Sequence, residues 1–337
     1  MLKAPKFWYK ENESNFSRIL YPASLIYKFT TKLYNILNKR VESDLPVICI
    51  GNLVVGGAGK TPVALKIGKL LKELGYNPHF LSRGYSGKIK ANIKIINDHS
   101  ADKVGDESLI LAEVAPTWIG SNRILSCHLA KKNGADCVVM DDGFQNPTIK
   151  KDFSIIVIDG KQGFGNKKVL PSGPLRESIN NGLKRANAII VVGEDNLNIK
   201  KLLPKSIPCF NAIFDVSKNK EIFKGKNITA FAGIAYPTKF FDTLGQQGAK
   251  ILKKINFPDH YIYNENDLLK LVEIANNNQS ILVTTKKDYV RIPNSYRTIV
   301  HKLDGEIVIK ENEVFNKVLS NVLKDLILHK KIQNDKI

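Results

Sequence analysis

The sequence predicts an α/β protein with a mostly parallel sheet carrying helices on both faces, a smaller C-terminal α/β lobe and an N-terminal amphipathic helix. Between residues 46 and 210, short apolar runs alternate with segments whose apolar residues recur at helical spacing. This alternation is typical of a parallel sheet covered by helices. The alternation restarts near residue 226, which indicates a second unit of the same class.

The length of the chain also favours two domains, because a single core rarely extends over 337 residues. We expect an N-terminal helix over 1–40, a first domain over 41–209, a connector over 210–226, a smaller domain over 227–330 and a tail over 331–337. Within the first domain, the glycines and prolines of residues 161–177 prevent a continuous helix or strand. A long irregular loop of this kind is usually a lid or a disordered segment.

The chain is strongly basic, with 51 Lys and Arg against 32 Asp and Glu and a net charge of +19. Such a balance favours anionic partners, which include nucleic acid, an anionic membrane surface and a phosphorylated substrate, and it does not choose among them. We expect no transmembrane helix and no signal peptide, because no apolar run is long enough. The four cysteines lie far apart without a Cys-x-x-Cys pair, so neither zinc binding nor disulfides are expected.

Residues 17–40 predict an amphipathic helix. Apolar side chains cover a broad face, and Lys28, Lys32 and Lys39 form a basic stripe opposite it. The aromatic cluster at residues 7–9 is of the kind that lies at lipid headgroups. This combination suits a helix in a membrane interface, and it suits equally a terminal helix that packs on the core.

The first strand-like run leads into a glycine-rich turn that ends in Lys-Thr at the start of a helix. This is the context that a phosphate-binding loop requires, because glycine lets backbone N–H groups approach phosphate oxygens and the helix N-terminus adds positive charge. We therefore expect a P-loop NTPase-like sheet, with Lys60 reaching the β- and γ-phosphates and Thr61 binding Mg²⁺. The pattern is not strict, because Val54 stands where a glycine is usual. The candidate nucleotide-binding residues are Gly56, Gly57, Ala58, Gly59, Lys60 and Thr61.

Polar clusters follow three further strand-like runs, and sheets of this class bind ligands beyond the carboxyl ends of their strands. Asp141 and Asp142 end one run and are candidate Mg²⁺ ligands, because adjacent carboxylates beside a phosphate loop favour a bound cation. Arg176 follows a stiff Pro-Leu in loop 161–177. Two interpretations of Arg176 stay open: it stabilises charge on the γ-phosphate, or it faces solvent on a mobile loop.

Asp106 and Glu107 begin a short apolar helix, and two interpretations stay open for them as well. Acidic residues stabilise a helix N-terminus electrostatically, which is the more common reason for their presence. Asp106 is alternatively the base that takes a proton from an attacking hydroxyl. Glu107 is a further candidate ligand for the metal ion.

Six groups of residues, in one order along the chain, closely resemble the lipid A 4′-kinase (tetraacyldisaccharide 4′-kinase) family. They are residues 51–52 with 56–62, 82–85, 105–107, 141–145, 163–166 with 170–177, and 257–260. The resemblance implies an ATP-dependent kinase that phosphorylates the 4′-hydroxyl of a tetraacylated glucosamine disaccharide 1-phosphate, with Mg²⁺ as cofactor. It also implies a peripheral protein whose N-terminal helix is seated on the cytoplasmic face of the bacterial inner membrane.

By the same resemblance, Asp106 is the catalytic base, and His260 of the second lobe orients or tunes it. A carboxylate hydrogen-bonded to an imidazole is suited to accept the proton of a sugar hydroxyl that attacks the γ-phosphate. The expected catalytic set is Asp106, His260, Lys60 and Arg176. The candidates to bind the substrate headgroup are Arg83, Tyr85, Arg123 and Gln145.

The chain departs from the family pattern at four positions. Asn146 stands where histidine is common, so any role of that histidine is in doubt here. Lys167 and Ser178 replace a usual glycine and a usual proline and affect the stiffness of loop 161–177 rather than the chemistry. Lys286 stands where glutamate is usual.

The last departure creates a rival function, because residues 285–288 read Thr-Lys-Lys-Asp and resemble the guanine-recognition motif of switch GTPases. Against a GTPase switch, residues 141–143 are not Asp-x-x-Gly, and the motif lies in a different lobe from Lys60. A basic nucleic-acid-binding ATPase is a third hypothesis. No recognition motif supports it, so we expect no nucleic-acid partner. A monomer is the favoured state.

Overall fold

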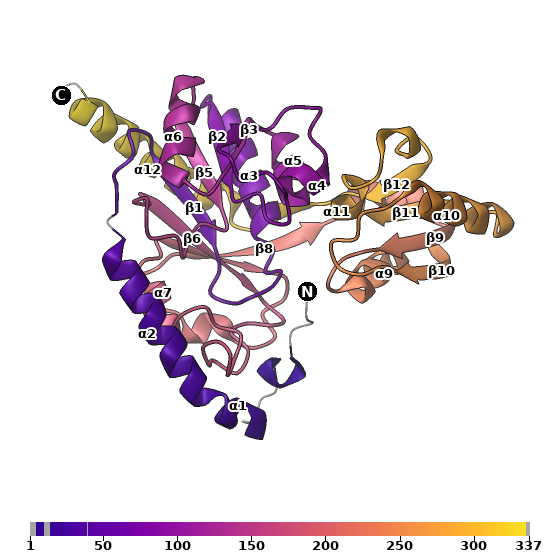
Figure 1. Ribbon diagram of the computed structural model, residues 1–337, viewed down its shortest axis with the longest axis horizontal. Coiled ribbons are helices and arrows are strands. Elements are labelled where there is room, and N and C mark those ends of the chain that lie inside the picture. The colour runs from indigo at the N-terminus through magenta and orange to yellow at the C-terminus, as the bar shows by residue number, and fades with distance from the viewer. Residues whose placement is uncertain (1–4, 10–13, 39, 335–337) are drawn as a thin grey trace.

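The computed structural model describes residues 5–9, 14–38 and 40–334. Its larger unit is built on a nine-stranded sheet with the order β13-β8-β7-β6-β1-β5-β2-β4-β3 (Figure 1). Neighbouring strands are parallel except at the two edges, where β3 and β13 run antiparallel. The strands are β1 (Val47–Gly51), β2 (Pro78–Ser82), β3 (Ile93–Lys94), β4 (Thr117–Ile119), β5 (Cys137–Asp141), β6 (Phe153–Asp159), β7 (Ala188–Val192), β8 (Cys209–Asp215) and β13 (Glu306–Ile309). The predicted mostly parallel sheet is confirmed.

Each face of this sheet carries its own core, because successive residues of a strand point to opposite faces. In β1, Ile48 and Ile50 join the core under the helices over 60–73 and 312–334, whereas Val47 and Cys49 join the core under the helices over 123–132 and 179–183. The helices of the unit are α3 (Lys60–Glu73), α4 (Ala101–Val104), α5 (Asp106–Ala112), α6 (Arg123–Lys132), α7 (Ile179–Leu183) and α12 (Asn312–Asn334), with a 3₁₀ turn at Ile199–Leu202. Helices therefore cover both faces, as predicted.

The second unit is a smaller sheet of four parallel strands with the order β10-β9-β11-β12, at the right of Figure 1. Its strands are β9 (Asn227–Ala232), β10 (Lys250–Asn256), β11 (Ile281–Thr285) and β12 (Val300–Leu303). Its helices are α8 (Lys220–Phe223), α9 (Pro237–Gln246), α10 (Glu265–Asn277) and α11 (Lys286–Tyr289), with 3₁₀ turns at Ser217–Asn219 and Asn294–Tyr296. Helices α9 and α10 contribute to separate cores, so this lobe is also α/β.

The chain returns to the large sheet after the second unit, which differs from the predicted division at 210–226 and 227–330. Strand β8 belongs to the large sheet, and β13 pairs with it. The buried residues of β13, Ile307 and Ile309, alternate with exposed ones and join the core to which α12 contributes Phe315. Helix α12 extends into the predicted tail as far as Asn334, and the last three residues lie outside the described part of the chain.

Two helices at the N-terminus, α1 (Asn15–Ile19) and α2 (Tyr21–Leu37), follow a 3₁₀ turn at Lys6–Tyr9 and confirm the predicted N-terminal helix. They run along the outside of the large unit (Figure 1). Lys39 of the predicted basic stripe lies outside the described residues. Within the described ranges, no helix combines the length and apolar character needed to cross a bilayer.

Hydroxyl groups hold these helices to loop 161–177. Ser17 Oγ donates to the Ser172 carbonyl, and Ser24 Oγ donates to the Val169 carbonyl, both at 2.8 Å. Most of the large apolar side chains point away from the protein, whereas Tyr27 is partly buried against the core. The exposed ones include Phe16, Ile19, Leu25, Ile26, Phe29, Leu33, Tyr34, Ile36 and Leu37. A surface helix normally buries its apolar face, so α1 and α2 have the reverse polarity.

Candidate active site

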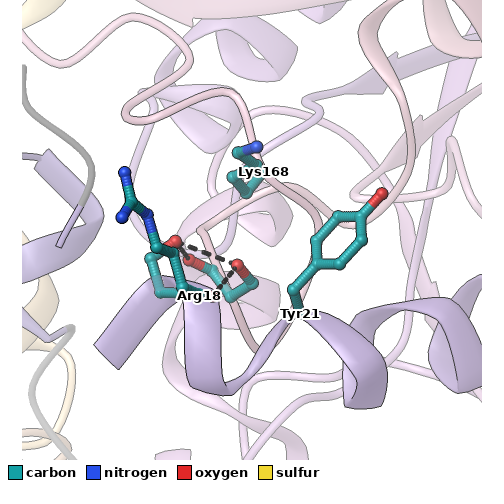
Figure 2. Close-up of a pocket in the computed structure, with 5 residues that line it drawn as sticks. Arg18, Tyr21 and Lys168 are labelled. Carbon is teal, nitrogen blue, oxygen red and sulfur yellow. Dashed lines mark hydrogen bonds between the residues drawn. The ribbon is translucent and has the colours of Figure 1, made fainter. Parts of the chain in front are cut away.

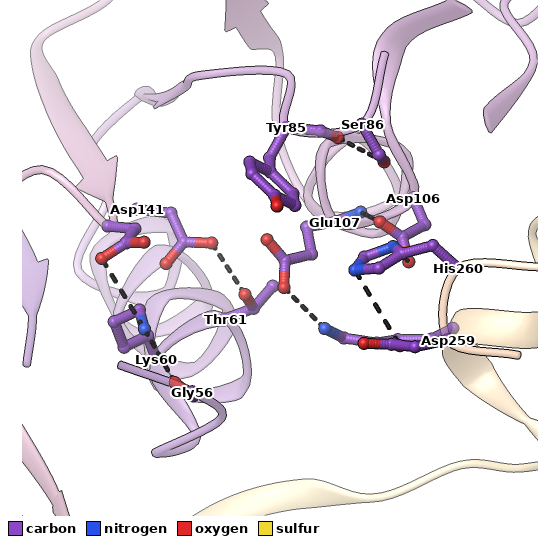
Figure 3. A network of polar contacts seen from close by, with 12 residues as sticks. Gly56, Lys60, Thr61, Tyr85, Ser86, Asp106, Glu107, Asp141, Asp259 and His260 are labelled. Atoms are coloured by element: carbon purple, nitrogen blue, oxygen red, sulfur yellow. Dashed lines mark hydrogen bonds and ion pairs between the residues drawn. The ribbon is translucent and has the colours of Figure 1, made fainter. Parts of the chain in front are cut away.

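The glycine-rich turn joins β1 to α3 and places Lys60 at the helix N-terminus (Figure 3). Gly56 (φ 116°) and Gly59 (φ 86°) adopt backbone conformations that other residues rarely adopt. Lys60 Nζ donates to Asn52 Oδ1 at 3.2 Å and lies 3.6 Å from Asp142 Oδ1. Burial lowers the pKa of Lys60, and Asp142 opposes this shift. The turn therefore combines a helix N-terminus with a nearby ammonium group, which suits a phosphate.

Val54, which departs from the usual motif, lies in extended backbone rather than in a left-handed part of the turn. It is buried and forms a β-bridge with Leu175 of loop 161–177. Next to it, the Val55 N–H donates to the Pro174 carbonyl at 2.8 Å. Extended backbone suits a β-branched residue. Valine is therefore compatible with this turn because the loop packs against it as a strand would.

Asp141 ends β5 beside the glycine-rich turn, and its two carboxylate oxygens differ in their hydrogen bonding. Its Oδ2 accepts a hydrogen bond from Thr61 Oγ1 at 2.8 Å, whereas its buried Oδ1 has no partner among the described residues. Burial, reinforced by the Glu107 carboxylate, raises the pKa of Asp141 to about 7. The described residues contain no cluster of three or more His, Cys, Asp and Glu arranged to hold a metal. Mg²⁺ needs only one or two carboxylates when phosphates and water supply its other ligands, so the site fits that ion.

Asp142 follows in the chain and is held by Arg176 of loop 161–177. Arg176 Nη1 and Nη2 donate to the two carboxylate oxygens at 2.9 and 3.2 Å, and Nη1 also donates to Gln145 Oε1 at 3.2 Å. Burial alone would raise the pKa of Asp142, but Lys60 and Arg176 outweigh it and hold the pKa below its usual value. Arg176 thus lies against the candidate metal and phosphate residues rather than in solvent.

Asp106 and His260 come from different units and meet between them (Figure 3). Asp106 begins α5 and is buried, and its Oδ2 lies 3.4 Å from His260 Nδ1. Burial alone would raise the pKa of Asp106. The hydrogen bond from His260 and the charges of Arg291 and Lys287 outweigh burial, so the pKa lies well below its usual value. Asp106 is therefore an ionised carboxylate at neutral pH, which a proton acceptor must be.

Glu107 lies between the phosphate loop and the Asp106–His260 pair (Figure 3). Its Oε1 is 2.5 Å from Lys287 Nζ of the second unit. Its charge also contributes to the raised pKa of Asp141. The candidate catalytic and metal residues therefore share one site between the two units.

The candidate headgroup residues differ in exposure. Arg83 and Tyr85 follow β2 and are exposed, and the Tyr85 ring packs against His260 with 5.8 Å between centroids. Arg123 is buried, and its Nη1 donates to carbonyl groups at the ends of β2 and β4, both at 2.5 Å. Burial lowers the pKa of Arg123 to about 10. Gln145 is partly buried, and its Nε2 donates to the carbonyl of Asn52 at 2.9 Å.

Arg291 and Lys287 were not among the predicted site residues. Arg291 Nη2 contacts Asp106 Oδ2, and Lys287 pairs with the neighbouring Glu107. Both basic residues follow β11, a central strand of the second sheet. Their position beyond the carboxyl end of a parallel strand is the sequence signal that points to them.

The interpretation of residues 285–288 as a guanine-recognition motif is wrong. Asp288, which would have to bind guanine, is buried and accepts hydrogen bonds from the Gly233 N–H and the Tyr263 hydroxyl, both at 2.9 Å. Lys286 pairs with Glu113 of the first unit. The motif therefore joins the two units instead of facing a base.

A separate basic cleft lies between α1–α2 and loop 161–177 (Figure 2). Two adjoining cavities of about 200 and 240 Å³ form it, and among the described residues that line them none is acidic. Their basic lining residues are Arg18, Lys28, Lys167 and Lys168. Lys167 has a left-handed backbone (φ 60°), which is strained for a residue with a side chain.

Comparison with known proteins identifies the family of the chain. A family model described as tetraacyldisaccharide-1-P 4′-kinase matches residues 16–324. A tetraacyldisaccharide 4′-kinase of Gluconobacter oxydans is 40% identical over 307 residues, covering 91% of this chain and 94% of the relative. The same enzyme of Rhodospirillum rubrum is 39% identical over 327 residues, covering 96% and 98%.

Among solved structures, LpxK from Aquifex aeolicus in complex with ATP aligns with a TM-score of 0.75 over 91% of this chain and 99% of that chain. At 24% sequence identity, this likeness concerns the fold. The match of the family model and the identity to the two relatives decide the family. The chain belongs to the tetraacyldisaccharide-1-P 4′-kinase family.

Proposed function

We propose that this protein is an ATP-dependent kinase that phosphorylates the 4′-hydroxyl of a tetraacylated glucosamine disaccharide 1-phosphate. The observation that carries the proposal is a single site that joins the turn around Lys60 to the buried Asp106–His260 pair. The names of the relatives support the choice of acceptor.

In this reaction the triphosphate lies along the glycine-rich turn and the acceptor hydroxyl approaches Asp106. A bond forms between the hydroxyl oxygen and the γ-phosphorus, the bond from the γ-phosphorus to the β–γ bridging oxygen breaks, and ADP leaves. Asp106 accepts the hydroxyl proton, and His260 orients the carboxylate. Lys60 and Arg176 stabilise the negative charge on the phosphate oxygens.

The end of β5 fits Mg²⁺ because Asp141 has a buried carboxylate oxygen without a partner among the described residues. We infer that Asp141 and the Thr61 hydroxyl hold the ion, with Asp142 and Glu107 as the other candidate ligands. An Mg²⁺ ion held by these residues would neutralise negative charge on the triphosphate.

We further infer that the protein is peripheral, on the cytoplasmic face of the bacterial inner membrane, where its acylated acceptor lies. The exposed apolar side of α1 and α2 supports this, with Ile26 66% and Phe29 67% exposed. The adjoining basic cleft complements anionic headgroups.

A kinase assay with labelled ATP or GTP and the acylated disaccharide phosphate tests the function. We expect label on the lipid from ATP, and Asp106→Asn to lower kcat by about 10²–10⁴-fold with unchanged ATP affinity, because only the general base is lost. Asp102→Asn in α4 is the matched control and leaves kcat near that of the wild type. Hydrolysis of GTP without lipid phosphorylation contradicts the proposal, and loss of ATP binding in Asp106→Asn contradicts the role of that residue.

Sedimentation with anionic vesicles tests the membrane contact. Phe29→Ser removes an exposed apolar side chain of α2, so vesicle binding weakens while the melting temperature stays unchanged. Val314→Ser, at an exposed position of α12, is the control and binds as the wild type does. Equal binding of Phe29→Ser and wild type would show that α2 does not contact the lipid.

A further inference from the structure

Three basic residues that follow β11 pair with three acidic residues in and next to α5. Lys286 Nζ lies 3.0 Å from Glu113 Oε2, and Lys287 Nζ lies 2.5 Å from Glu107 Oε1. Arg291 completes the series through its contact with Asp106. The first two pairs are partly exposed, whereas the side chains of Arg291 and Asp106 are each 2% exposed. The buried pair is therefore the one that involves the proposed base.

Contacts within the second unit hold the Arg291 guanidinium in place, in addition to its contact with Asp106. Its Nη1 donates to the Gly233 carbonyl at 2.8 Å and to Asp288 Oδ1 at 3.0 Å. Asp288 in turn accepts a hydrogen bond from Thr285 Oγ1 at 2.6 Å, in addition to those from Gly233 and Tyr263. A guanidinium held this way presents its remaining nitrogen in one direction, because its donors lie in one rigid plane.

Both oxygens of Asp106 are then engaged. Oδ1 accepts the Glu107 N–H of its own helix at 2.9 Å, and Oδ2 meets Arg291 Nη2 and His260 Nδ1. Arg291 Nη2 and His260 Nδ1 are themselves 3.4 Å apart. The first unit supplies one contact, and the second unit supplies the other two. The plane of the carboxylate consequently depends on the second unit being docked on α5.

We propose that Arg291 is a positioning residue that sets the orientation of the Asp106 carboxylate and makes the assembly of the base dependent on docking of the second unit. This inference rests on the proposed kinase function. The Arg291 side chain is 2% exposed and contacts Asp106, so we assign it an action through that carboxylate rather than on the acceptor or the phosphates. Thr285, Asp288 and Arg291 act as a clamp on Asp106, which gives a role to the segment that resembled a guanine-binding motif.

Steady-state kinetics of the full chain test the proposal. In Arg291→Gln the carboxylate loses its fixed partner, so we expect kcat to fall about 100-fold, a size that misplacement of a reacting group by about 1 Å produces. KM for ATP stays unchanged because the phosphate loop is untouched. Arg291→Lys keeps the positive charge but not the rigid planar set of donors, so we expect it to recover only part of the activity. Lys286→Ala removes an outer pair of the same interface and is the matched control, with kcat near that of the wild type.

Two further measurements separate positioning from simple destabilisation. In an Asp106→Asn background, Arg291→Gln lowers kcat no further, since the group that it orients is already disabled. If Arg291→Gln does not fold, Asp288→Asn releases the guanidinium and is expected to lower kcat in the same way. Equal loss in Arg291→Gln and Lys286→Ala, additive loss in the double variant, or full activity of Asp288→Asn overturns the role of Arg291. A wild type that does not phosphorylate the lipid overturns the proposed function instead.

Discussion

Two carboxylates of the site, Asp106 and Asp141, have pKa values that shift in opposite directions because their neighbours differ. Both are buried, and burial alone raises the pKa of each. Asp106 has His260 and cationic neighbours, which bring its pKa below the usual value. Asp141 has the Glu107 carboxylate nearby, and its pKa rises to about 7. Asp106 is therefore ionised at neutral pH, whereas a cation beside Asp141 would lower the pKa of that carboxyl and favour its ionised form.

His260→Ala shifts the pH dependence of the reaction. The variant loses the hydrogen bond that lowers the pKa of Asp106, so that pKa rises and the acid limb of kcat moves to higher pH. In the wild type, the folded-state pKa of Asp106 is below its unfolded value of about 3.9. Its contribution to stability is therefore present above that value and is lost as the pH falls through the folded-state pKa. The variant loses part of this contribution at neutral pH.

The measurement is kcat against pH from about 3 to 8, with ATP and lipid saturating, so that the range reaches below the usual pKa of an aspartate. His128→Ala, at an exposed position of α6, is the control and keeps the profile of the wild type. An acid limb at the same pH in His260→Ala and wild type would separate His260 from Asp106.

Single residues were predictable where a local pattern carries the chemistry. Lys60, Thr61 and Asp141 follow from a strand, a glycine-rich turn and a strand end. Arg291 did not follow, because its partner Asp106 is 185 positions away and only the fold joins them. Residues 285–288, which precede Arg291, were interpreted from their residue types alone. Residue types do not reveal that Asp288 is buried in the clamp.

Among the elements, α2 is amphipathic in the reverse of the usual sense, because its apolar side is exposed rather than packed on the protein. Its apolar residues predicted a helix, and the structure confirms that helix. The side of α2 that packs on the protein is set by Ser24, and Ser17 plays the same part in α1; both donate to backbone carbonyl groups of loop 161–177. One serine in each of two largely apolar helices gives no such signal in the sequence. For this reason the choice between membrane contact and core packing stayed open there.

Ser24→Ala tests this attachment. Ser24 is 1% exposed, donates to the Val169 carbonyl and accepts from the Ser172 N–H at 3.1 Å. Alanine leaves the Ser172 N–H without this partner and removes one of the two hydrogen bonds to the Val169 carbonyl, which the Gly173 N–H still contacts at 3.2 Å, so we expect about 1–3 kcal/mol of destabilisation. Urea unfolding measures it. Thr30→Ala, which removes an exposed hydroxyl of the same helix, changes stability by less than about 0.5 kcal/mol. Equal stability of the two variants would show that the hydroxyl contributes nothing.

For the whole molecule, the fold class was predictable, and the path of the chain between the units was not. The repeated alternation of strands and helices predicted two α/β units, and both are present. Strand β13 is only four residues long, and its partner β8 lies far before it in the chain. Short edge strands carry little pattern, so the return to the large sheet was missed.

Phe315→Ala tests this return. Phe315 of α12 is buried in the core of the large unit and packs edge-to-face on Phe210 of β8, with 5.0 Å between ring centroids. Loss of the ring leaves a cavity, so we expect about 3–5 kcal/mol of destabilisation in urea unfolding. Phe16→Ala removes a ring that is 68% exposed and costs less than about 0.5 kcal/mol. A similar cost for both variants would contradict the assignment of α12 to this core.

The two segments that cross between the units lie side by side, because Asp215 at the end of β8 is paired with Glu306 at the start of β13. The Asp304 N–H, in one crossing segment, also donates to Asn219 Oδ1 in the other at 3.2 Å. Two connecting segments of this kind permit one unit to rotate relative to the other about a single axis, and they resist sliding of the units past each other. A small molecule that binds at these connecting segments and rotates the second unit would separate both His260 and Arg291 from Asp106. It would inhibit the enzyme without competing with ATP, because the glycine-rich turn lies in the other unit.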